Sequence, residues 1–481
     1  MRKHVRAVPA RCLLVLTLVC CLFPGASVAA SMATRPGPGA AGAGDAYFPR
    51  YGNGGYDVTR YDIHVRYRPR THRLIGRTTV TARASQGLTR FNLDLVLQPS
   101  EVRVNGRSAE FTHGRHELTV HPASPLVKGS TFRVLVAYAG KPAAISFNRV
   151  RPWLTAAGGA VAAGEPEIAA WWFPGNDHPS DKARYTVAIT APRSLQAISN
   201  GTLAHRRRNG ATTTWSWRMR QPMASYLAFL AIGHYDLESG TAGGLPYLYA
   251  FDSGLGSDGA RARRAVRRTP SIARWLESVW GPYPFRQLGG VVLGRNTGFA
   301  LENQTRPVYP NNLLRTDGTR LVAHELSHQW FGDAVSIRKW RDVWLNEGPA
   351  TYSEWLWQQH RGLNTPQQIF LDTYRLNGAR SSLWDVKIGD PGPRSLFSWP
   401  IYDRSAMTLQ ALRNRVGNTT FFAIMRGWVH GRRGGNGSTR QFIAYAQRLS
   451  GQRLARFFHR WVFSTGRPAN TSANGLPGRR P

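Results

Sequence analysis

The chain has 481 residues, and 63 basic against 27 acidic side chains give it a formal net charge of +36 at pH 7. This length allows two or three domains, each large enough to bury a core of its own. The charge is mostly arginine spread along the chain, without a nucleic-acid recognition motif or aromatic residues interleaved in a basic stripe. We therefore expect no specific nucleic acid partner. The charge is explained better by attraction to an anionic cell envelope, or simply by a biased composition, than by binding of nucleic acid.

Residues 1–30 are predicted to be a cleavable secretory signal. A basic opening precedes a twelve-residue apolar run over 12–23, and small residues follow up to Ala30. This run is shorter than the about 20 apolar residues that a membrane span needs. A lipoprotein anchor at Cys20 or Cys21 is the other alternative, and it is disfavoured because Val19, before Cys20, stands where such sites need a small residue. We expect the mature protein to be secreted.

All three cysteines of the chain lie inside this predicted signal. The mature chain would therefore hold no disulfide and no thiolate metal ligand, and a chain of this length can be stable without either. Residues 31–45 are rich in glycine, alanine and proline, and they are predicted to be a flexible linker.

Residues 46–238 are predicted to form an N-terminal, β-sandwich-like domain. Apolar and polar residues alternate over 57–67, 77–82 and 131–138, as in half-buried strands. Turn signals such as Asn105-Gly106 separate these segments, and no stretch of helix length has helical periodicity.

Residues 239–466 are predicted to form a mainly helical domain. Apolar residues follow helical spacing over 259–280, 344–360, 405–416, 419–429 and 439–449. Another helix is expected to begin near Asp317 or Thr319, because either side chain can cap it. Residues 467–481 are rich in proline, glycine and arginine and are predicted to be a disordered tail.

The helix expected after Asp317 carries the sequence His324-Glu325-Leu326-Ser327-His328, and Glu347 follows after an eighteen-residue spacer. Positions i and i+4 of a helix share one face, so both imidazoles can bind one ion. Two imidazoles and one carboxylate make a zinc site with its fourth position left for water, which is typical of catalytic zinc. Glu325 is then placed to act as general base towards that water. A surface helix that carries two histidines by chance is the alternative.

Four separated segments resemble the aminopeptidase N family of zinc metallopeptidases and occur in the order that the family has. They are residues 172–183, 299–303, 324–333 and 344–354. The resemblance implies an α+β multidomain fold, in which a β-sandwich or saddle-like domain precedes a thermolysin-like, mainly helical zinc catalytic domain. It also implies a short, two-domain, secreted form with one Zn²⁺ per chain, bound by His324, His328 and Glu347.

The resemblance extends to residues around the metal. Tyr402 lies about where the family keeps a catalytic tyrosine, whose hydroxyl would stabilise an oxyanion; an ordinary buried tyrosine is the alternative. Ala300 and Glu302 lie in a segment that resembles the family's substrate-binding strand, where the glutamate carboxylate would bind the free α-ammonium of a peptide; a surface glutamate on an edge strand is the alternative. Glu167 matches a second residue of this clamp less securely, and Glu165 competes with it.

Two more carboxylates can support the metal ligands through hydrogen bonds. Glu354 lies seven residues after Glu347 on the same helical face, within reach of a ligand histidine. Asp333 is the second candidate. For both, a solvated or capping role is the alternative.

Three features depart from the family pattern. Phe299 stands where the family has glycine, so its side chain can narrow a subsite. Pro349 replaces an aromatic residue after the Glu-Gly of the second zinc helix. The chain also ends soon after the expected catalytic domain, which would leave the cleft more open than in longer relatives.

The expected function is release of N-terminal residues from peptides, with zinc-activated water as nucleophile and Glu325 as general base. A zinc endopeptidase of the same fold is the first alternative. A non-catalytic binding relative is the second, and it is disfavoured because the three ligands and the base are all present. The preferred N-terminal residue, the physiological substrate and the oligomeric state do not follow from the sequence.

Overall fold

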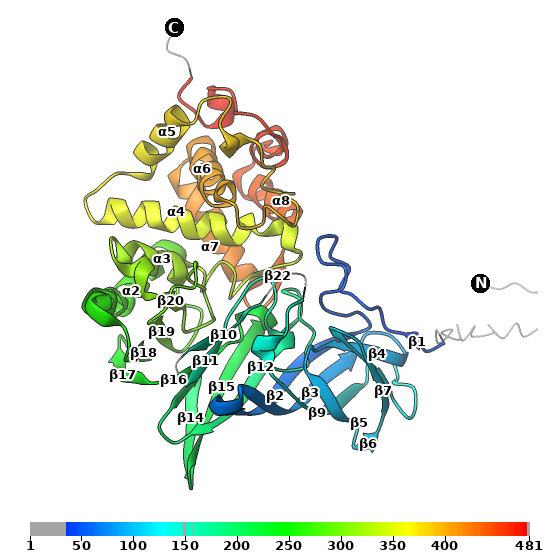
Figure 1. Ribbon diagram of the computed structural model, residues 1–481. Helices are drawn as coiled ribbons and strands as arrows, with labels where there is room; N and C mark the ends of the chain where they lie inside the picture. Colours follow the sequence, from blue (N-terminus) through cyan, green and yellow to red (C-terminus); the bar gives the residue numbers. More distant parts are fainter. Residues whose placement is uncertain (1–34, 148–150, 157, 479–481) are drawn as a thin grey trace, which may run out of the picture. The chain divides into compact units, whose positions relative to one another are not determined.

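The computed structural model describes residues 35–147, 151–156 and 158–478. The secretory signal expected over residues 1–30 lies outside the described residues. From Pro36 onwards the chain forms one unit, which has a sheet-rich N-terminal half and a mainly helical C-terminal half (Figure 1).

The N-terminal half is built around an eight-stranded sheet with the order β14-β15-β12-β2-β3-β9-β5-β6. Every second side chain of β2 is buried over most of its length, as the alternation in the sequence predicts. β2 pairs in parallel with β12 and antiparallel with β3. The strands are β2 (Tyr56–Arg68), β3 (Arg73–Ala84), β5 (Gln98–Val104), β6 (Arg107–Ser108), β9 (Thr131–Gly140), β12 (Lys182–Pro192), β14 (Thr202–Asn209) and β15 (Thr212–Ala224).

Two four-stranded sheets complete this half, with the orders β1-β4-β8-β7 and β10-β11-β16-β13. The strands of the first are β1 (Gly37–Pro38), β4 (Leu88–Asp94), β7 (Glu110–His113) and β8 (Glu117–His121). Those of the second are β10 (Trp153–Ala156), β11 (Gly159–Ala162), β13 (Gln196–Ser199) and β16 (Leu230–Gly233).

The linker predicted over residues 31–45 is wrong for its described part. β1 pairs with β4, and Gly39 N donates to Arg90 O at 2.7 Å. Asp45 is 2% exposed, and its carboxylate accepts a hydrogen bond from Trp340 N at 2.8 Å. These contacts hold a segment whose composition alone suggested flexibility.

The C-terminal half contains a sheet that the sequence pattern did not predict. Its order is β17-β18-β19-β20, with β17 (Tyr235–Ala242), β18 (Leu245–Asp252), β19 (Leu288–Leu293) and β20 (Val308–Pro310). The domain boundary expected at residue 238 falls within β17. All six residues of β19 are buried, so its sequence has no alternation that would mark a strand.

Helices make up most of the remainder of this half, and α4 has the bounds that the sequence predicted. The helices are α1 (Gly259–Val266), α2 (Thr269–Trp280), α3 (Gly318–Ser327), α4 (Trp344–His360), α5 (Pro366–Leu376), α6 (Trp399–Val416), α7 (Asn418–Arg432), α8 (Thr439–Ser450) and α9 (Ala455–Phe458). A short parallel pair, β21 (Ser336–Ile337) and β22 (Asn436–Gly437), connects the segment after α3 to the loop before α8.

Two helix predictions needed correction. The single helix expected over 259–280 is divided into α1 and α2, and Pro270 lies at the start of α2, where its missing N–H costs least. α6 begins at Trp399 rather than at residue 405, with Pro400 in its first turn. Tyr402 therefore lies on a helix.

The tail predicted to be disordered from residue 467 is ordered as far as residue 478. Tyr374 donates a hydrogen bond to Pro468 O at 2.7 Å, and Trp461 Nε1 donates to Asn474 O at 3.1 Å. Leu476 is 3% exposed. The two hydrogen bonds and the burial of Leu476 hold this segment in place, although its composition favours disorder.

None of the helices in the described part of the chain combines the length and the apolarity needed to cross a lipid bilayer.

Candidate active site

The helices α3 and α4 bring the predicted ligands together. Asp317 caps α3 by accepting a hydrogen bond from Arg320 N at 3.3 Å. His324 lies in the last turn of α3, and His328 follows directly as its C-cap. Glu347 lies in the first turn of α4, and Pro349 lies in the next turn, inside the helix, where it has no N–H to donate to the carbonyl of Leu345.

Three donor atoms converge between these helices. Glu347 Oε2 lies 3.4 Å from His324 Nε2 and 3.5 Å from His328 Nε2. All three residues are buried, and Glu347 Oε2 has no hydrogen-bond partner within the described structure. Such spacing is what three ligands show around one ion at about 2 Å from each. The donor set therefore fits Zn²⁺.

The outer nitrogens of both histidines are occupied, which fixes the orientation of the rings. His324 Nδ1 is 2.7 Å from Glu354 Oε1, and His328 Nδ1 is 3.1 Å from Phe331 O. Nε2 of each ring is thereby left for the metal. Glu354 thus occupies the supporting position that the sequence predicted. The side chain of Asp333 is buried but hydrogen-bonds neither ligand in the described structure, so the carbonyl of Phe331 replaces it in that role.

The protonation preferences of the two central carboxylates differ. Burial raises the pKa of Glu325 to about 7, against the opposing charges of the neighbouring histidines. Burial would also raise the pKa of Glu347, but the charge of His328 and the close approach of both histidine rings lower it to about 2. Glu347 is therefore anionic and suited to bind a metal, whereas Glu325 is suited to exchange a proton near neutral pH.

These groups open into a cavity of about 400 Å³. Its walls contain the metal-ligand set and Glu325, together with residues of both halves of the chain. The remaining lining residues are Glu165, Gly298, Phe299, Ala300, Leu301, Glu302, Leu321, Glu354, Phe397 and Tyr402.

Glu302 occupies the cavity wall that the sequence predicted. It is 3% exposed, and its Oε1 accepts a hydrogen bond from Tyr226 at 3.3 Å. Its backbone carbonyl accepts from Gln329 Nε2 at 3.2 Å, which ties this segment to the chain just after α3. Leu301 forms an isolated antiparallel bridge with Val308, and residues 299–303 belong to no named strand.

Glu165, rather than Glu167, is the acidic residue that shares the cavity with Glu302. Burial, and then the charges of Glu302 and Glu347, raise the pKa of Glu165. Glu167 is fully buried elsewhere, hydrogen-bonded to His116 Nε2. The two glutamates flank one proline, and their sequence gives no reason to choose between them. The prediction for Glu167 is corrected in favour of Glu165.

Tyr402 reaches the cavity from the first turn of α6. The centroid of its ring is 6.2 Å from that of His324. Burial and the charge of Glu347 raise its pKa well above the ordinary value for tyrosine, so the hydroxyl stays protonated and can donate a hydrogen bond.

Two aromatic side chains line the outer part of the cavity. Phe299 is 44% exposed and Phe397 is 38% exposed. The sequence marked Phe299, because the family has glycine at this position. It did not mark Phe397, because no motif surrounds that residue. Both are placed to contact a substrate side chain.

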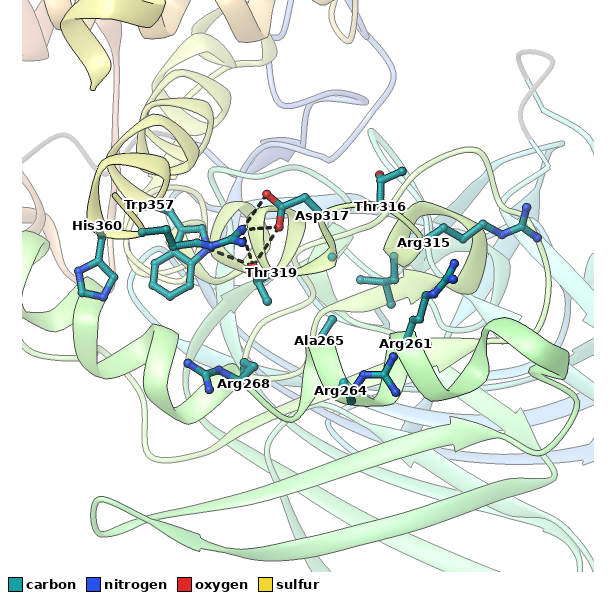
Figure 2. Close-up of a pocket in the computed structure, with 13 residues that line it drawn as sticks. Arg261, Arg264, Ala265, Arg268, Arg315, Thr316, Asp317, Thr319, Trp357 and His360 are labelled. Atoms are coloured by element: carbon teal, nitrogen blue, oxygen red, sulfur yellow. Dashed lines mark hydrogen bonds and ion pairs between the residues drawn. The ribbon is translucent and has the colours of Figure 1, made fainter. Parts of the chain in front are cut away.

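A second, larger cavity of about 770 Å³ lies at the other end of α3 and shares no lining residue with the first. Figure 2 shows arginines from α1 and from the segments around α3 and α4 along its walls. Arg361 pairs with both carboxylate oxygens of Asp317 at 2.9 Å. Five of its lining residues are arginines and one, Asp317, is acidic, so the lining carries a net positive charge.

Two protein-family models match the sequence of the chain. The model described as the peptidase M1 N-terminal domain matches residues 58–227, and the peptidase family M1 domain matches residues 269–461. The chain therefore belongs to the peptidase M1 family of zinc metallopeptidases. This confirms the resemblance to aminopeptidase N and the predicted order of a β-rich domain followed by a helical catalytic domain.

Curated relatives are aminopeptidases that are longer than this chain. Aminopeptidase M1 of Arabidopsis thaliana is 25% identical over 334 residues, which cover 64% of this chain and 37% of that protein. Aminopeptidase N of Acetobacter pasteurianus is 32% identical over 194 residues, which cover 37% of this chain and 54% of that protein. The chain thus spans less than two thirds of each of these relatives.

Solved structures match over nearly the whole chain. A mutant of a two-domain M1 zinc metallopeptidase bound to L-arginine has 28% sequence identity and a TM-score of 0.81, covering 89% of this chain and 99% of its own. A mutant M1 zinc metallopeptidase from Deinococcus radiodurans, bound to a Tyr-Ser-Ala substrate, has 28% identity and a TM-score of 0.78, covering 90% and 100%.

Proposed function

We propose that this protein is a zinc aminopeptidase that hydrolyses the first peptide bond of peptides with a free N-terminus. The observation that carries the proposal is a pair of carboxylates, buried Glu302 and partly buried Glu165, in the same cavity as the metal-ligand set and Glu325. The names of the relatives and the tripeptide bound to the Deinococcus enzyme support the same class of reaction.

The chain's own residues provide the proton transfers and the positioning. Zn²⁺, when bound by His324, His328 and Glu347, supplies Lewis-acid chemistry that activates water and polarises the scissile carbonyl. Glu325 accepts the proton of the attacking water and delivers it to the leaving amine. The Tyr402 hydroxyl donates a hydrogen bond to the oxyanion that develops on the scissile carbonyl.

Glu302 and Glu165 fix the position of the peptide. Burial raises the pKa of both carboxyls, and the charge of Glu302 raises that of Glu165 further, so negative charge is poorly tolerated at this pair. An α-ammonium group placed between them neutralises that charge. With the ammonium held at Glu302, in the wall of the cavity that also contains the metal-ligand set, the first peptide bond is the one presented for attack.

The test compares one peptide in its free and N-acetylated forms, with and without a chelator. We expect cleavage of the free form alone and loss of cleavage with the chelator. Glu302→Gln should lower kcat/KM for the free peptide by about 10-fold to 100-fold, because an ion pair to a buried carboxylate is worth roughly 1.5–3 kcal/mol. Glu110→Gln, at an exposed strand position, serves as the matched control and should leave kcat/KM unchanged.

Two outcomes would point to the alternatives. Equal cleavage of the acetylated peptide, with Glu302→Gln at full activity, would favour a zinc endopeptidase of the same fold. Absence of chelator-sensitive hydrolysis of either form, in protein that retains zinc, would favour a non-catalytic relative.

We also propose that the protein is secreted. The support is the sequence of residues 1–30, with its basic start, short apolar run and small residues at the expected cleavage position. N-terminal sequencing of protein recovered from the culture medium should give a chain that starts at Ala30 or Ser31. Recovery of the uncut chain from the cell interior would contradict the proposal.

The arginine-lined cavity supports a further proposal, association with an anionic cell envelope (Figure 2). Arg264 and Arg268 are exposed and form no ion pair within the described structure. Binding to phosphatidylglycerol vesicles, but not to phosphatidylcholine vesicles, should weaken as salt rises from about 0.05 to about 0.5 M. Replacing both arginines by glutamine should weaken binding more than the same change at Arg207 and Arg208. Equal losses for the two pairs would assign the binding to net charge alone.

A further inference from the structure

A second cluster of metal-ligand side chains lies in the N-terminal half, outside the active-site cavity. Asp94 ends β4 and Glu117 begins β8, and these two residues pair across the antiparallel strands. His116 directly precedes β8. One donor atom from each of the three residues lies within 4.8 Å of the others.

The donor atoms of this cluster are buried and lack hydrogen-bond partners in the described structure. They are Asp94 Oδ1, His116 Nδ1 and both carboxylate oxygens of Glu117. Asp94 is 0% and His116 3% exposed, and the side chain of Glu117 is 21% exposed. Buried polar atoms are almost always paired in folded proteins, so several unpaired atoms in one place need an explanation.

The spacing of these atoms resembles that of the zinc-ligand set. His116 Nδ1 is 3.6 Å from Asp94 Oδ1 and 3.8 Å from Glu117 Oε1. These distances are too long for hydrogen bonds. The corresponding distances from Glu347 to its two histidines in the active site are 3.4 and 3.5 Å.

The surroundings of His116 fix its ring in the orientation that a metal ligand needs. Nε2 hydrogen-bonds Glu167, as His324 hydrogen-bonds Glu354, and Nδ1 is left facing the two carboxylates. The ring also stacks on Phe147, with ring centroids 4.4 Å apart.

Asp94 is held in a comparable way. Its Oδ2 accepts hydrogen bonds from Asp177 N at 2.7 Å and from Asn53 Nδ2 at 3.3 Å. Oδ1 is the atom left over, and it is the one that faces His116.

The charges of the cluster also call for a cation. Asp94, Glu117 and Glu167 bring three carboxylates around one imidazole in a buried place, and burying unbalanced charge is costly. Arg50 and Arg115 line an adjoining cavity of about 440 Å³ but form no ion pair with these carboxylates in the described structure. That cavity also borders His116 and Glu117, so it gives an ion a route in and leaves space for water ligands.

We propose that Asp94, His116 and Glu117 bind a divalent transition-metal ion, separate from the catalytic metal. One imidazole and two carboxylates suit Zn²⁺ or Mn²⁺, whereas Ca²⁺ and Mg²⁺ prefer oxygen ligands alone. The ion ties β4 to β8. Through the hydrogen bond from His116 to Glu167, it also holds the loop that carries Glu165 to the active-site cavity.

The test isolates this site in the mature chain by removing the catalytic ligands with the double substitution His324→Gln and Glu347→Gln. After loading with Zn²⁺ or Mn²⁺ and dialysis, elemental analysis should find one ion per chain in this variant and two in the unchanged protein loaded with Zn²⁺. Adding Glu117→Gln should remove the remaining ion, while adding Glu110→Gln, on the neighbouring strand β7, should not.

The same variants give a readout that does not depend on activity. Zn²⁺ or Mn²⁺ should raise the unfolding midpoint of the catalytic-ligand variant, and Glu117→Gln should abolish this rise while leaving the metal-free midpoint and the circular dichroism spectrum close to those of the parent. A catalytic-ligand variant that retains no ion, or an ion that survives Glu117→Gln, would overturn the proposal.

Discussion

Burial raises the pKa of both Glu325 and Tyr402, but the consequence differs between the two groups. It raises the pKa of Glu325 to about 7, so the carboxylate can both accept and release a proton near neutral pH. It raises the pKa of Tyr402 far above any working pH, so the hydroxyl remains a hydrogen-bond donor. One property of the cavity, its poor solvation, thus prepares one group for proton transfer and the other for oxyanion binding.

Tyr402→Phe should lower kcat by about 10²–10³, because removing one donor to an oxyanion costs roughly 3–4 kcal/mol. KM and zinc content should remain close to those of the unchanged protein, since the hydroxyl contacts neither the metal-ligand set nor the ammonium site in our proposal. Steady-state kinetics with a fluorogenic aminoacyl substrate would measure both constants. Tyr445→Phe, on α8, is the control, and equal kcat values for the two variants would contradict the role of Tyr402.

The metal ligands could be predicted from the sequence because local geometry decides their positions. The spacing of His324 and His328 on one helix brings them to one face whatever the rest of the fold does. The choice between Glu165 and Glu167 could not be predicted in this way. It depends on the path of a loop and on the pairing of Glu167 with His116, from a different part of the chain.

At the scale of elements, α3 has only 10 residues, with His324 in its last turn and His328 as its C-cap. A helix this short is marginal on its own, so its ends and its packing matter. Asp317 caps its first turn and also pairs with Arg361, which follows the last residue of α4. Ser327 Oγ and Ser353 Oγ, 2.7 Å apart, connect α3 to α4 near the metal-ligand set.

Asp317→Ala should lower the free energy of unfolding by about 1 kcal/mol, as expected for loss of a helix N-cap. The partly exposed pair with Arg361 should add little to this. Urea unfolding of the metal-free protein would measure the change. Asp372→Ala, at an exposed position of α5 that pairs with Arg375, should change stability by less than about 0.5 kcal/mol. Equal effects at the two positions would contradict the capping role.

Elements without periodicity were the ones that the sequence did not reveal. Every residue of β19 is buried, so its sequence cannot be distinguished from a buried helical segment by pattern alone. α4 is also buried along most of its length, but its 17 residues are more than a strand usually has, and its bounds were predicted correctly.

At the scale of the whole molecule, buried polar contacts join the two halves. Lys182, at the start of β12, donates hydrogen bonds to the carbonyls of Asp333, Ala334 and Gly435 at 2.6, 3.2 and 3.3 Å. Arg306, just after the Glu302 segment, donates to the carbonyls of Ser199 and Gly201. The wall of the active-site cavity is therefore anchored to the N-terminal half.

Lys182 should give this interface a measurable pH dependence. Burial lowers its pKa from 10.5 to about 7, against the weaker opposing charge of Asp333. Between these pH values the unfolded chain binds a proton that the folded chain has lost. The free energy of unfolding therefore increases as the pH rises. The gain should reach at most about 1.4 kcal/mol per pH unit.

The measurement compares the unchanged protein with Lys182→Met by urea unfolding at pH about 7.5 and about 9.5. The difference in unfolding free energy between the two should increase at the higher pH, in favour of the lysine. A difference that is the same at both pH values would contradict burial of an uncharged lysine at this interface.

The order of the two domains followed from the sequence, but their contacts did not. Lys182 and Arg306 look like ordinary surface cations in the sequence, because nothing nearby marks them as buried. Their partners are backbone carbonyls far along the chain, and carbonyls carry no sequence signal.

Proton transfer by Glu325 is central to the proposed mechanism, in which this residue is not merely a structural carboxylate beside the metal. Glu325→Gln keeps the size and the hydrogen-bonding capacity of the side chain but removes its basicity. We expect kcat on a peptide with a free N-terminus to fall by about 10²–10⁴, with zinc content equal to that of the unchanged protein because Glu325 is not a ligand. Turnover at the unchanged rate in zinc-loaded Glu325→Gln would contradict the mechanism.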